Sequence, residues 1–212
     1  MMNKDEDYWD NKYPKITIQY TGRFIPQVGR YAIDVRAFLG NPRCVEFDRL
    51  INEIKPLWIH THEYLGVKKE WCDDQKALAC LKWVINNIKY LSDKSQFNLI
   101  EYWMYPQESL HVRAGDCDDG AILLANLMLV LGIPQWKIRI VAGWTFDHQG
   151  HCYVTYYCEE TEKWVALDWC FYPNTKKIKD RRDYKNSGIY ADVWFSWTKK
   201  QAYGKLEELE KC

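Results

Sequence analysis

Residues 113–134 read RAGDCDDGAILLANLMLVLGIP, a run that turns from charged to almost wholly apolar. Asp116 can cap a helix by accepting hydrogen bonds from free backbone N–H groups, and the closing Gly-Ile-Pro supplies stop signals. Within residues 121–131 every side chain but one is apolar, so this helix has no polar face to expose to water. The pattern predicts a helix through the centre of a domain, with Cys117 as its first residue.

A cysteine at the N-terminus of a buried helix is a candidate nucleophile. The positive end of the helix dipole favours a thiolate, and the free N–H groups there can bind an oxyanion beside the sulfur. Asp116, Asp118 and Asp119 crowd the same turn and oppose ionisation of Cys117, with Arg113 as a partial offset. We therefore expect the thiol to depend on a basic partner.

The partner is expected among strands that follow the helix. Segments rich in aromatic and β-branched residues predict three strands, at 136–144, 151–158 and 163–168. If the last two are joined by a four-residue turn, Cys158 pairs with Lys163, and His151 and Asp168 become diagonal neighbours about 7 Å apart on one face. A slip of one residue would place them on opposite faces.

These three residues then divide the work of an acyl transfer. Cys117 attacks, His151 takes the thiol proton and returns it to the leaving amine, and Asp168 orients the imidazole and stabilises its charge. His148 lies close in sequence to His151, but only His151 begins the strand whose face Asp168 shares.

The motifs resemble those of the transglutaminase-like superfamily, within the papain-like cysteine enzymes and especially among bacterial and phage peptidases. The resemblance covers roughly residues 70–170, and its motifs are GDCDD at 115–119, LGIP at 131–134, Gly150-His151 and the strand end WVALD at 164–168. It implies an α+β fold with a papain/transglutaminase-like core, in which the nucleophile begins a central buried helix packed on an antiparallel sheet.

The resemblance also implies an upstream side chain that completes the oxyanion hole. Trp103 and Gln107 are the two candidates, because transglutaminases use a tryptophan there and papain-type proteases a glutamine. Trp144 and Trp169, near the ends of the motifs, are candidates for a substrate groove, although tryptophan more often packs in a core.

Acidic residues beside the nucleophile bind calcium in some bacterial cysteine proteases of this type, which makes Asp116 and Asp118 candidate ligands. Helix capping explains these residues without an ion and is the preferred interpretation. His60 and His62 would share one face of a strand, but they lack a nearby third ligand. The prediction is therefore that the protein needs no metal and no cofactor.

Composition limits the partners. Twenty-nine basic and twenty-nine acidic residues leave no net charge to attract nucleic acid, and no apolar run is long enough to span a bilayer. The N-terminus lacks the apolar core of a secretory signal, so we read the eight cysteines as reduced thiols and expect a cytoplasmic protein. The expected partner is a peptide or protein substrate, with neither nucleic acid nor membrane.

The chain is expected to divide into three parts. These are an N-terminal extension packed on the core at residues 1–65, a catalytic domain at 66–198 and a C-terminal tail at 199–212. Apolar residues at helical spacing predict an amphipathic helix within 71–91 that packs beside the cysteine helix.

Two functions of different class remain open. The first is a cysteine protease, amidase or acyltransferase that works through a thioester, with hydrolysis favoured because the sequence shows no channel that would shield a thioester from water. The second is a catalytically silent domain that kept the fold as a protein-binding module. Retention of all three catalytic residue types favours the enzyme.

Overall fold

A computed structural model describes residues 9–26, 29–40, 45–54, 72–171, 173, 177–181, 183 and 187–205. The predicted histidine pair at 60 and 62 lies outside these residues. The helices are α2 (Val45–Ile54), α4 (Asp73–Asn87), α5 (Asp93–Phe97), α6 (Pro106–Val112) and α7 (Cys117–Val130), with short 3-10 turns η1 (Val35–Phe38), η3 (Gln135–Lys137) and η4 (Ile178–Asp180).

Five antiparallel strands form the main sheet of the described chain. They are β7 (Ile138–Thr145), β8 (Gly150–Cys158), β9 (Lys163–Leu167), β10 (Tyr190–Trp197) and β11 (Ala202–Gly204), in the order β11-β10-β7-β8-β9. Strands β8 and β9 pair with Cys158 opposite Lys163, as the assumed four-residue turn requires. Residues 202–204, which the sequence analysis assigns to the tail, pair as an edge strand with β10.

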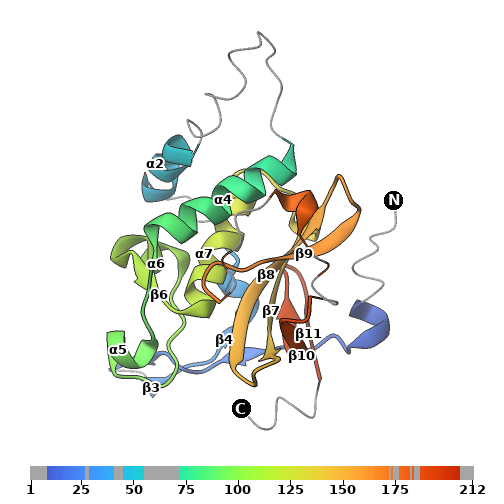
Figure 1. Cartoon of the computed structure of the whole chain (residues 1–212). Coiled ribbons are helices and arrows are strands. Elements are labelled where there is room, and N and C mark those ends of the chain that lie inside the picture. Colours follow the sequence, from blue (N-terminus) through green and yellow to red (C-terminus); the bar gives the residue numbers. More distant parts are fainter. Residues whose placement is uncertain are drawn as a thin grey trace.

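The helices pack on one face of this sheet, with α7 between the sheet and the other helices (Figure 1). Helix α7 is buried on all sides, as its lack of a polar stripe predicts. Its single polar interior residue, Asn126, donates to the carbonyls of Phe38 and Ile122 at 2.8 Å each. The α+β arrangement expected from the sequence is confirmed.

The N-terminal part of the chain contributes to both faces of the sheet. Phe47, Leu50 and Ile54 of α2 are buried in the same core as α4 and α7. On the other face, Trp9 and Tyr13 cover the sheet around Tyr203 and form a second, smaller core with it. Residues of the predicted extension are thus packed against the sheet and helices.

Three pairs of short strands complete the described fold: β1 (Gln19–Tyr20) with β4 (Ile33–Asp34), β2 (Phe24–Ile25) with β3 (Gly29–Arg30), and β5 (Lys89–Tyr90) with β6 (Ala114–Gly115). The last pair is parallel and sets Tyr90 opposite Gly115, two residues before Cys117. It therefore ties the segment after α4 to the entry of α7.

The described helices include none with the length and apolar character needed to cross a bilayer. Placement in the cytoplasm stays a prediction.

Candidate active site

Helix α7 begins at Cys117, with Asp116 in extended conformation at the N-cap. Asp119, at the third helical position, accepts the backbone N–H of Asp116 at 3.2 Å and that of Met104 at 2.7 Å. These bonds fix the helix entry from two directions. They also hold the segment before α6 against the first turn of α7.

Cys117 and His151 line one cavity of about 200 Å³ at the start of α7. Tyr90, Cys170 and Phe171 line it as well. Among the described residues no hydrogen bond joins the Cys117 thiol to His151, and their close approach stays a prediction. The two groups share a cavity in which a reacting carbonyl could meet both.

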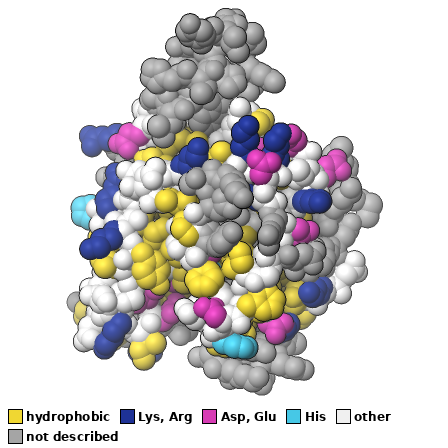
Figure 2. Space-filling model, viewed as in Figure 1, with side chains coloured by type: hydrophobic (Ala, Val, Ile, Leu, Met, Phe, Trp, Pro, Cys, Tyr) yellow, Lys and Arg dark blue, Asp and Glu magenta, His cyan; other side chains and the backbone are white. Residues whose placement is uncertain are grey.

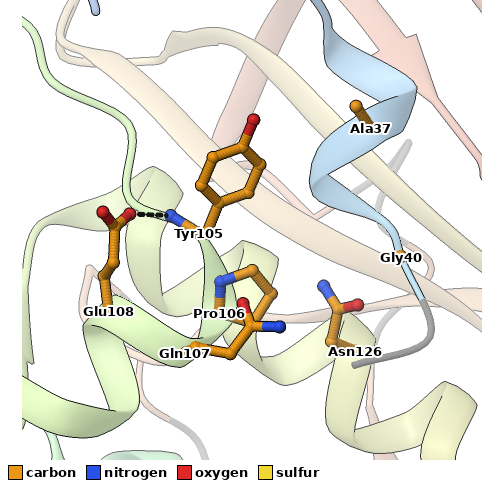
Figure 3. A pocket seen from close by; sticks show the side chains of 7 residues that line it. All are labelled: Ala37, Gly40, Tyr105, Pro106, Gln107, Glu108 and Asn126. Atoms are coloured by element: carbon orange, nitrogen blue, oxygen red, sulfur yellow. Dashed lines mark hydrogen bonds between the residues drawn. The ribbon is translucent and has the colours of Figure 1, made fainter. Parts of the chain in front are cut away.

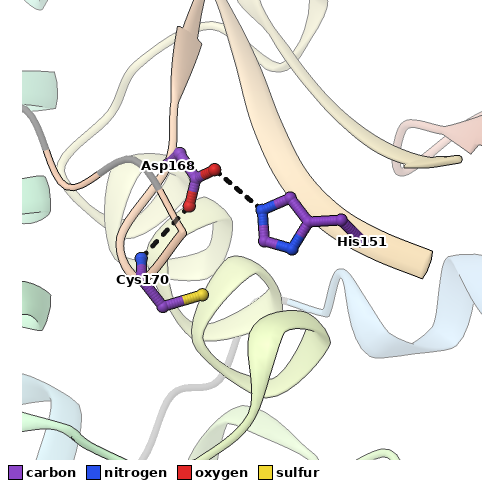
Figure 4. A group of neighbouring side chains, drawn as sticks. All are labelled: His151, Asp168 and Cys170. Carbon is purple, nitrogen blue, oxygen red and sulfur yellow. Dashed lines mark hydrogen bonds and ion pairs between the residues drawn. The ribbon is translucent and has the colours of Figure 1, made fainter. Parts of the chain in front are cut away.

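The imidazole of His151 is held by Asp168, whose Oδ2 lies 2.7 Å from Nε2 (Figure 4). Both residues are buried, Asp168 almost completely. Their approach follows from the β8–β9 register, which places them as diagonal neighbours. Because Nε2 is engaged, Nδ1 is the nitrogen left for proton transfer.

Asp168 accepts four hydrogen bonds from described residues. Besides His151, Tyr190 Oη donates to Oδ2 at 2.8 Å, and the backbone N–H groups of Cys170 and Phe171 donate to Oδ1 at 3.1 and 3.2 Å. Burial alone would raise the pKa of Asp168, but hydrogen bonds and the charge of His151 hold it below its ordinary value. The carboxylate is therefore a fixed negative charge behind the imidazole.

Tyr190 is a site residue that the sequence analysis missed. Its ring stacks on Tyr153 at 3.9 Å between centroids and lies nearly parallel to the His151 ring at 6.3 Å. It reaches Asp168 from β10, two strands away from β8. No motif in the sequence marks it.

The electrostatic surroundings of Cys117 oppose a thiolate. Burial, the Asp116 carboxylate and the Cys170 thiol raise the pKa of Cys117 well above its ordinary value, and the backbone N–H of Cys152 lowers it in part. This agrees with the expectation that the acidic turn outweighs the helix dipole. In this environment the thiol form of Cys117 is favoured over the thiolate.

The structure places neither oxyanion candidate at this cavity. Trp103 is buried in a stack between Tyr20 and Trp197, and its indole N–H donates to Glu101. Gln107 lies on α6 and lines a separate cavity of about 500 Å³ with Asn126 (Figure 3). The family resemblance pointed to the segment that contains both residues, but neither side chain lines the cavity at Cys117.

Of the two groove candidates, only Trp144 is accessible. It pairs with Gly150, which lines the cavity, and its ring meets Trp194 edge-on at 4.7 Å. Trp169 is 4% exposed, and its indole N–H donates to the carbonyl of Cys117 at 3.2 Å. The expectation that Trp169 lines a groove is corrected: it packs against α7 and holds the helix start.

The contact between Trp169 and Gly120 gives a prediction about stability. A Cβ at Gly120 would lie 2.1 Å from the Trp169 ring. Alanine gains about 1 kcal/mol over glycine in a helix, but overpacking a core costs about 1 to 3 kcal/mol. We expect Gly120→Ala to lower the free energy of unfolding in urea. Gly40→Ala is the control, because a Cβ there would approach no described atom more closely than 3.9 Å, and it should change the free energy of unfolding by less than about 0.5 kcal/mol. Equal stability of the two variants would contradict the packing argument.

Tyr90 is a second residue that the sequence analysis missed. Its side chain is 53% exposed and forms a wall of the cavity beside Cys117. Burial of part of the phenol and its electrostatic interaction with Cys117 and Asp116 raise the pKa of Tyr90, so it keeps its proton over the physiological range. Tyr90 is thus a neutral O–H donor next to the candidate nucleophile.

An acidic cluster lies behind the first turn of α7. Oxygen atoms of Asp93, Asp116 and Asp119 come within 4.8 Å of one another. Within the described chain, one buried oxygen each of Asp93, Asp116 and Asp118 has no hydrogen-bond partner. Burial, together with the charge of Asp116, raises the pKa of Asp93 to about 7, and burial raises that of Asp119 to about 8. Hard cations such as calcium bind carboxylate oxygens, so these three unpaired oxygens are suitable ligands for such an ion.

Solved structures with a similar fold include EGTA-treated LapG of Legionella pneumophila, which is 18% identical. The match covers 76% of this chain and 74% of LapG, with a TM-score of 0.52. A candidate cysteine protease of Cytophaga hutchinsonii is 21% identical, with a TM-score of 0.44, over 84% of this chain and 51% of its own. A search of curated proteins finds no match to this sequence.

The expectation of a site without a metal is contradicted. LapG has also been solved in a calcium-bound form, which is 19% identical over 73% of this chain and 87% of its own, with a TM-score of 0.44. In this chain Asp116 belongs to an acidic cluster with unpaired buried oxygens. Helix capping, which favoured an ion-free site, accounts for the Asp119 side chain but leaves the other oxygens unexplained.

The family model of the transglutaminase-like superfamily matches residues 63–169, about half of the chain. The match contains the entry of α7, strands β7 and β8, and Asp168, so it includes every residue that forms the His-Asp pair and the candidate nucleophile. The chain belongs to the transglutaminase-like superfamily.

Proposed function

We propose that this protein is a cysteine hydrolase that cleaves amide bonds of peptides or proteins. The observation that carries the proposal is the buried His151–Asp168 pair, which opens onto the same cavity as the first residue of a buried helix, Cys117. A thiol, a base and an orienting carboxylate are the three groups that amide cleavage through a thioester requires.

The proposed reaction has two halves. The Cys117 thiol gives its proton to Nδ1 of His151 while its sulfur attacks the amide carbon. The C–N bond then breaks and the imidazolium protonates the leaving amine, which leaves a thioester on Cys117. Water, deprotonated by His151, attacks the thioester carbon and releases the acid and the thiol. Asp168 stays ionised throughout and stabilises the imidazolium.

We assign the oxyanion hole to backbone N–H groups at the start of α7 and to the phenol of Tyr90. Tyr90→Phe removes the donor but keeps the ring that walls the cavity. We expect kcat to fall by about 100-fold, the usual loss for one oxyanion donor. The free energy of unfolding should stay unchanged. Tyr157→Phe, on a partly buried ring of β8 outside the cavity, is the matched control. Equal kcat values for Tyr90→Phe and Tyr157→Phe would contradict the assignment of Tyr90 to the oxyanion hole.

The acidic cluster is proposed to hold a divalent cation of the calcium type, with Asp93, Asp116 and Asp119 as ligands. Its positive charge would offset the carboxylates that raise the pKa of Cys117. Asp116 links the two groups, because it both belongs to the cluster and is the residue before the thiol.

The pKa values of the cluster predict how stability depends on pH. From an ordinary value of 3.8, the pKa is raised to about 7 for Asp93 and about 8 for Asp119. The folded protein then keeps protons that the unfolded chain releases, so this pair makes stability fall as pH rises from about 4 to 8. Calcium needs the ionised carboxylates, so the rise in Tm on adding calcium should be large at pH 8 and small at pH 5.

Differential scanning calorimetry with and without calcium measures this effect. Asp116→Asn should lose most of the calcium response at pH 8. Glu162→Gln, in the turn between β8 and β9, changes one exposed acid elsewhere and should keep it. A calcium response that is equal at the two pH values, or retained in Asp116→Asn, would contradict the assignment.

The surface around the cavity suits an extended polypeptide. Hydrophobic side chains gather in the middle of the face shown in Figure 2, with acidic side chains near their lower border. Phe171 and Tyr90 wall the cavity and Trp144 flanks it, and all three are at least 39% exposed. Exposed aromatic rings beside a reactive centre offer contacts for side chains on both sides of a scissile bond.

A peptide library read by mass spectrometry, with and without a primary amine, tests the function. Cleavage that depends on Cys117 supports the hydrolase, and amine incorporation at the expense of cleavage would indicate a transferase. Peptides that bind without either reaction would favour the silent binding module.

A further inference from the structure

The acidic cluster is held by the segment of chain that precedes α6. The backbone N–H of Tyr102 donates to Oδ2 of Asp93. Two residues further on, the backbone N–H of Met104 donates to Oδ1 of Asp119 at 2.7 Å. The first of these bonds leaves Oδ1 as the unpaired oxygen of Asp93, a residue that is only 2% exposed. The two N–H groups therefore fix both carboxylates and determine which oxygen of Asp93 is left for an ion.

Trp103, the residue between these two donors, is held by the N-terminal part of the chain. Its backbone N–H donates to Oη of Tyr20 at 2.8 Å. Its carbonyl accepts from Nε and Nη2 of Arg23 at 3.2 and 3.0 Å. The Tyr20 ring also stacks on the Trp103 indole, with 5.0 Å between centroids, and all three residues are buried. Tyr20 and Arg23 thus fix both backbone groups of Trp103.

Arg23 extends this support to the start of α6. Its guanidinium pairs with both carboxylate oxygens of Glu108. Oε2 of Glu108 in turn accepts the backbone N–H of Tyr105 at 2.6 Å. The guanidinium also lies over the rings of Tyr102 and Tyr105, at 4.9 and 4.4 Å from their centroids. Because the planar fork of arginine can make these contacts together, Arg23 ties the segment 102–105 to the start of α6.

We propose that Tyr20 and Arg23 are positioning residues of the acidic cation site and act on it through the backbone of residues 102–104. This inference rests on the proposed calcium site. It extends that site to a part of the chain outside residues 63–169, the range that the family model matches. Carboxylate ligands of metals are themselves held by hydrogen bonds, and loss of an outer partner costs about 10- to 100-fold in metal affinity. Residues of the predicted N-terminal extension would then preorganise the carboxylates for the ion.

Tyr20→Phe tests the inference, because it removes the acceptor of the Trp103 N–H and keeps the stacked ring. Calorimetric titration of the reduced full-length chain with calcium at pH 8, above the pKa of Asp93, measures the affinity without any substrate. We expect the Kd for calcium to rise by at least about tenfold. Tyr13→Phe is the matched control, because Tyr13 is a buried ring of the N-terminal part in the smaller core on the other face of the sheet. It should keep the Kd of the parent protein.

Arg23→Lys is the second variant. Lysine keeps the positive charge but lacks the fork that reaches the Trp103 carbonyl and Glu108 together, so the Kd for calcium should again rise by at least about tenfold. Hydrogen exchange of backbone amides in the calcium-free protein separates positioning from a general loss of stability. The amides of Tyr102 and Met104 should exchange faster in Tyr20→Phe than in the parent, whereas the amides of β8 should exchange at the parent rate.

The possible outcomes separate this inference from the proposed function. Kd values of Tyr20→Phe and Arg23→Lys that both stay within about twofold of the parent, well below the loss expected for an outer partner, would overturn the inference alone. An equal rise in Tyr13→Phe would overturn it as well. A parent protein that binds no calcium would refute the calcium site of the proposed function and this inference with it. Because no substrate enters these measurements, loss of hydrolysis alone would refute the hydrolase and leave the positioning role standing.

Discussion

Cys117→Ala is expected to lower turnover of a cleavable peptide by about 10⁴ to 10⁶-fold, which amounts to loss of activity. Alanine removes the only group that forms the thioester and leaves the cavity otherwise intact. The variant should still fold, because Cys117 sits at the end of α7 and the helix core is untouched. Burst kinetics and mass spectrometry of the acyl-enzyme measure the effect directly.

Cys72→Ala is the matched control, since Cys72 is an exposed thiol at the N-cap of α4. It should retain the parent rate. Peptide binding by Cys117→Ala, measured by calorimetry, should stay close to that of the parent. A turnover rate in Cys117→Ala close to that of the parent would contradict the role of Cys117 as nucleophile.

Asp168→Asn is expected to reduce kcat by about 10⁴-fold, the loss seen when a triad carboxylate becomes an amide. The amide can still contact Nε2 of His151, but it has no charge to stabilise the imidazolium. Structure and stability should change less than activity, because the amide oxygen can keep accepting from the backbone N–H groups of Cys170 and Phe171.

Tyr190→Phe provides a graded comparison. The phenol of Tyr190 donates one of the hydrogen bonds that hold the pKa of Asp168 low. Removing the hydroxyl should therefore raise that pKa and move the acidic limb of the pH–rate profile to higher pH. The loss of rate should be far smaller than in Asp168→Asn. Equal losses in the two variants, or an Asp168→Asn enzyme within tenfold of the parent, would mean that the carboxylate charge is not needed.

Local patterns in the sequence were enough to predict the centre of the fold. Helix α7 could be predicted because its cap and its apolar run lie within one segment, and both act through neighbours a few residues apart. The His151–Asp168 approach could be predicted because a four-residue turn fixes the register of β8 and β9. In each case the deciding interaction spans a short stretch of chain.

Residues brought in by distant segments could not be predicted. Tyr90 reaches the cavity through a parallel pair of two-residue strands joined across more than twenty residues, too short to leave a periodic pattern. Tyr190 arrives from β10, whose pairing with β7 contains register shifts that no turn reveals. Trp103 was assigned through the family resemblance and Trp169 through its place near the end of a motif. In the structure Trp103 stacks on Trp197 and Trp169 packs against the start of α7, contacts that neither the resemblance nor the motif reveals.

The central claim is that Cys117 and His151 act as a pair at the start of α7. Limiting iodoacetamide near neutral pH, with calcium present and digestion followed by peptide-resolved mass spectrometry, tests it without a known substrate. The account predicts that Cys117 is alkylated first among the cysteines and that His151→Ala slows its alkylation at least about tenfold. An inert Cys117 with preferential labelling of Cys72 or Cys170, or an unchanged rate in His151→Ala, would contradict it.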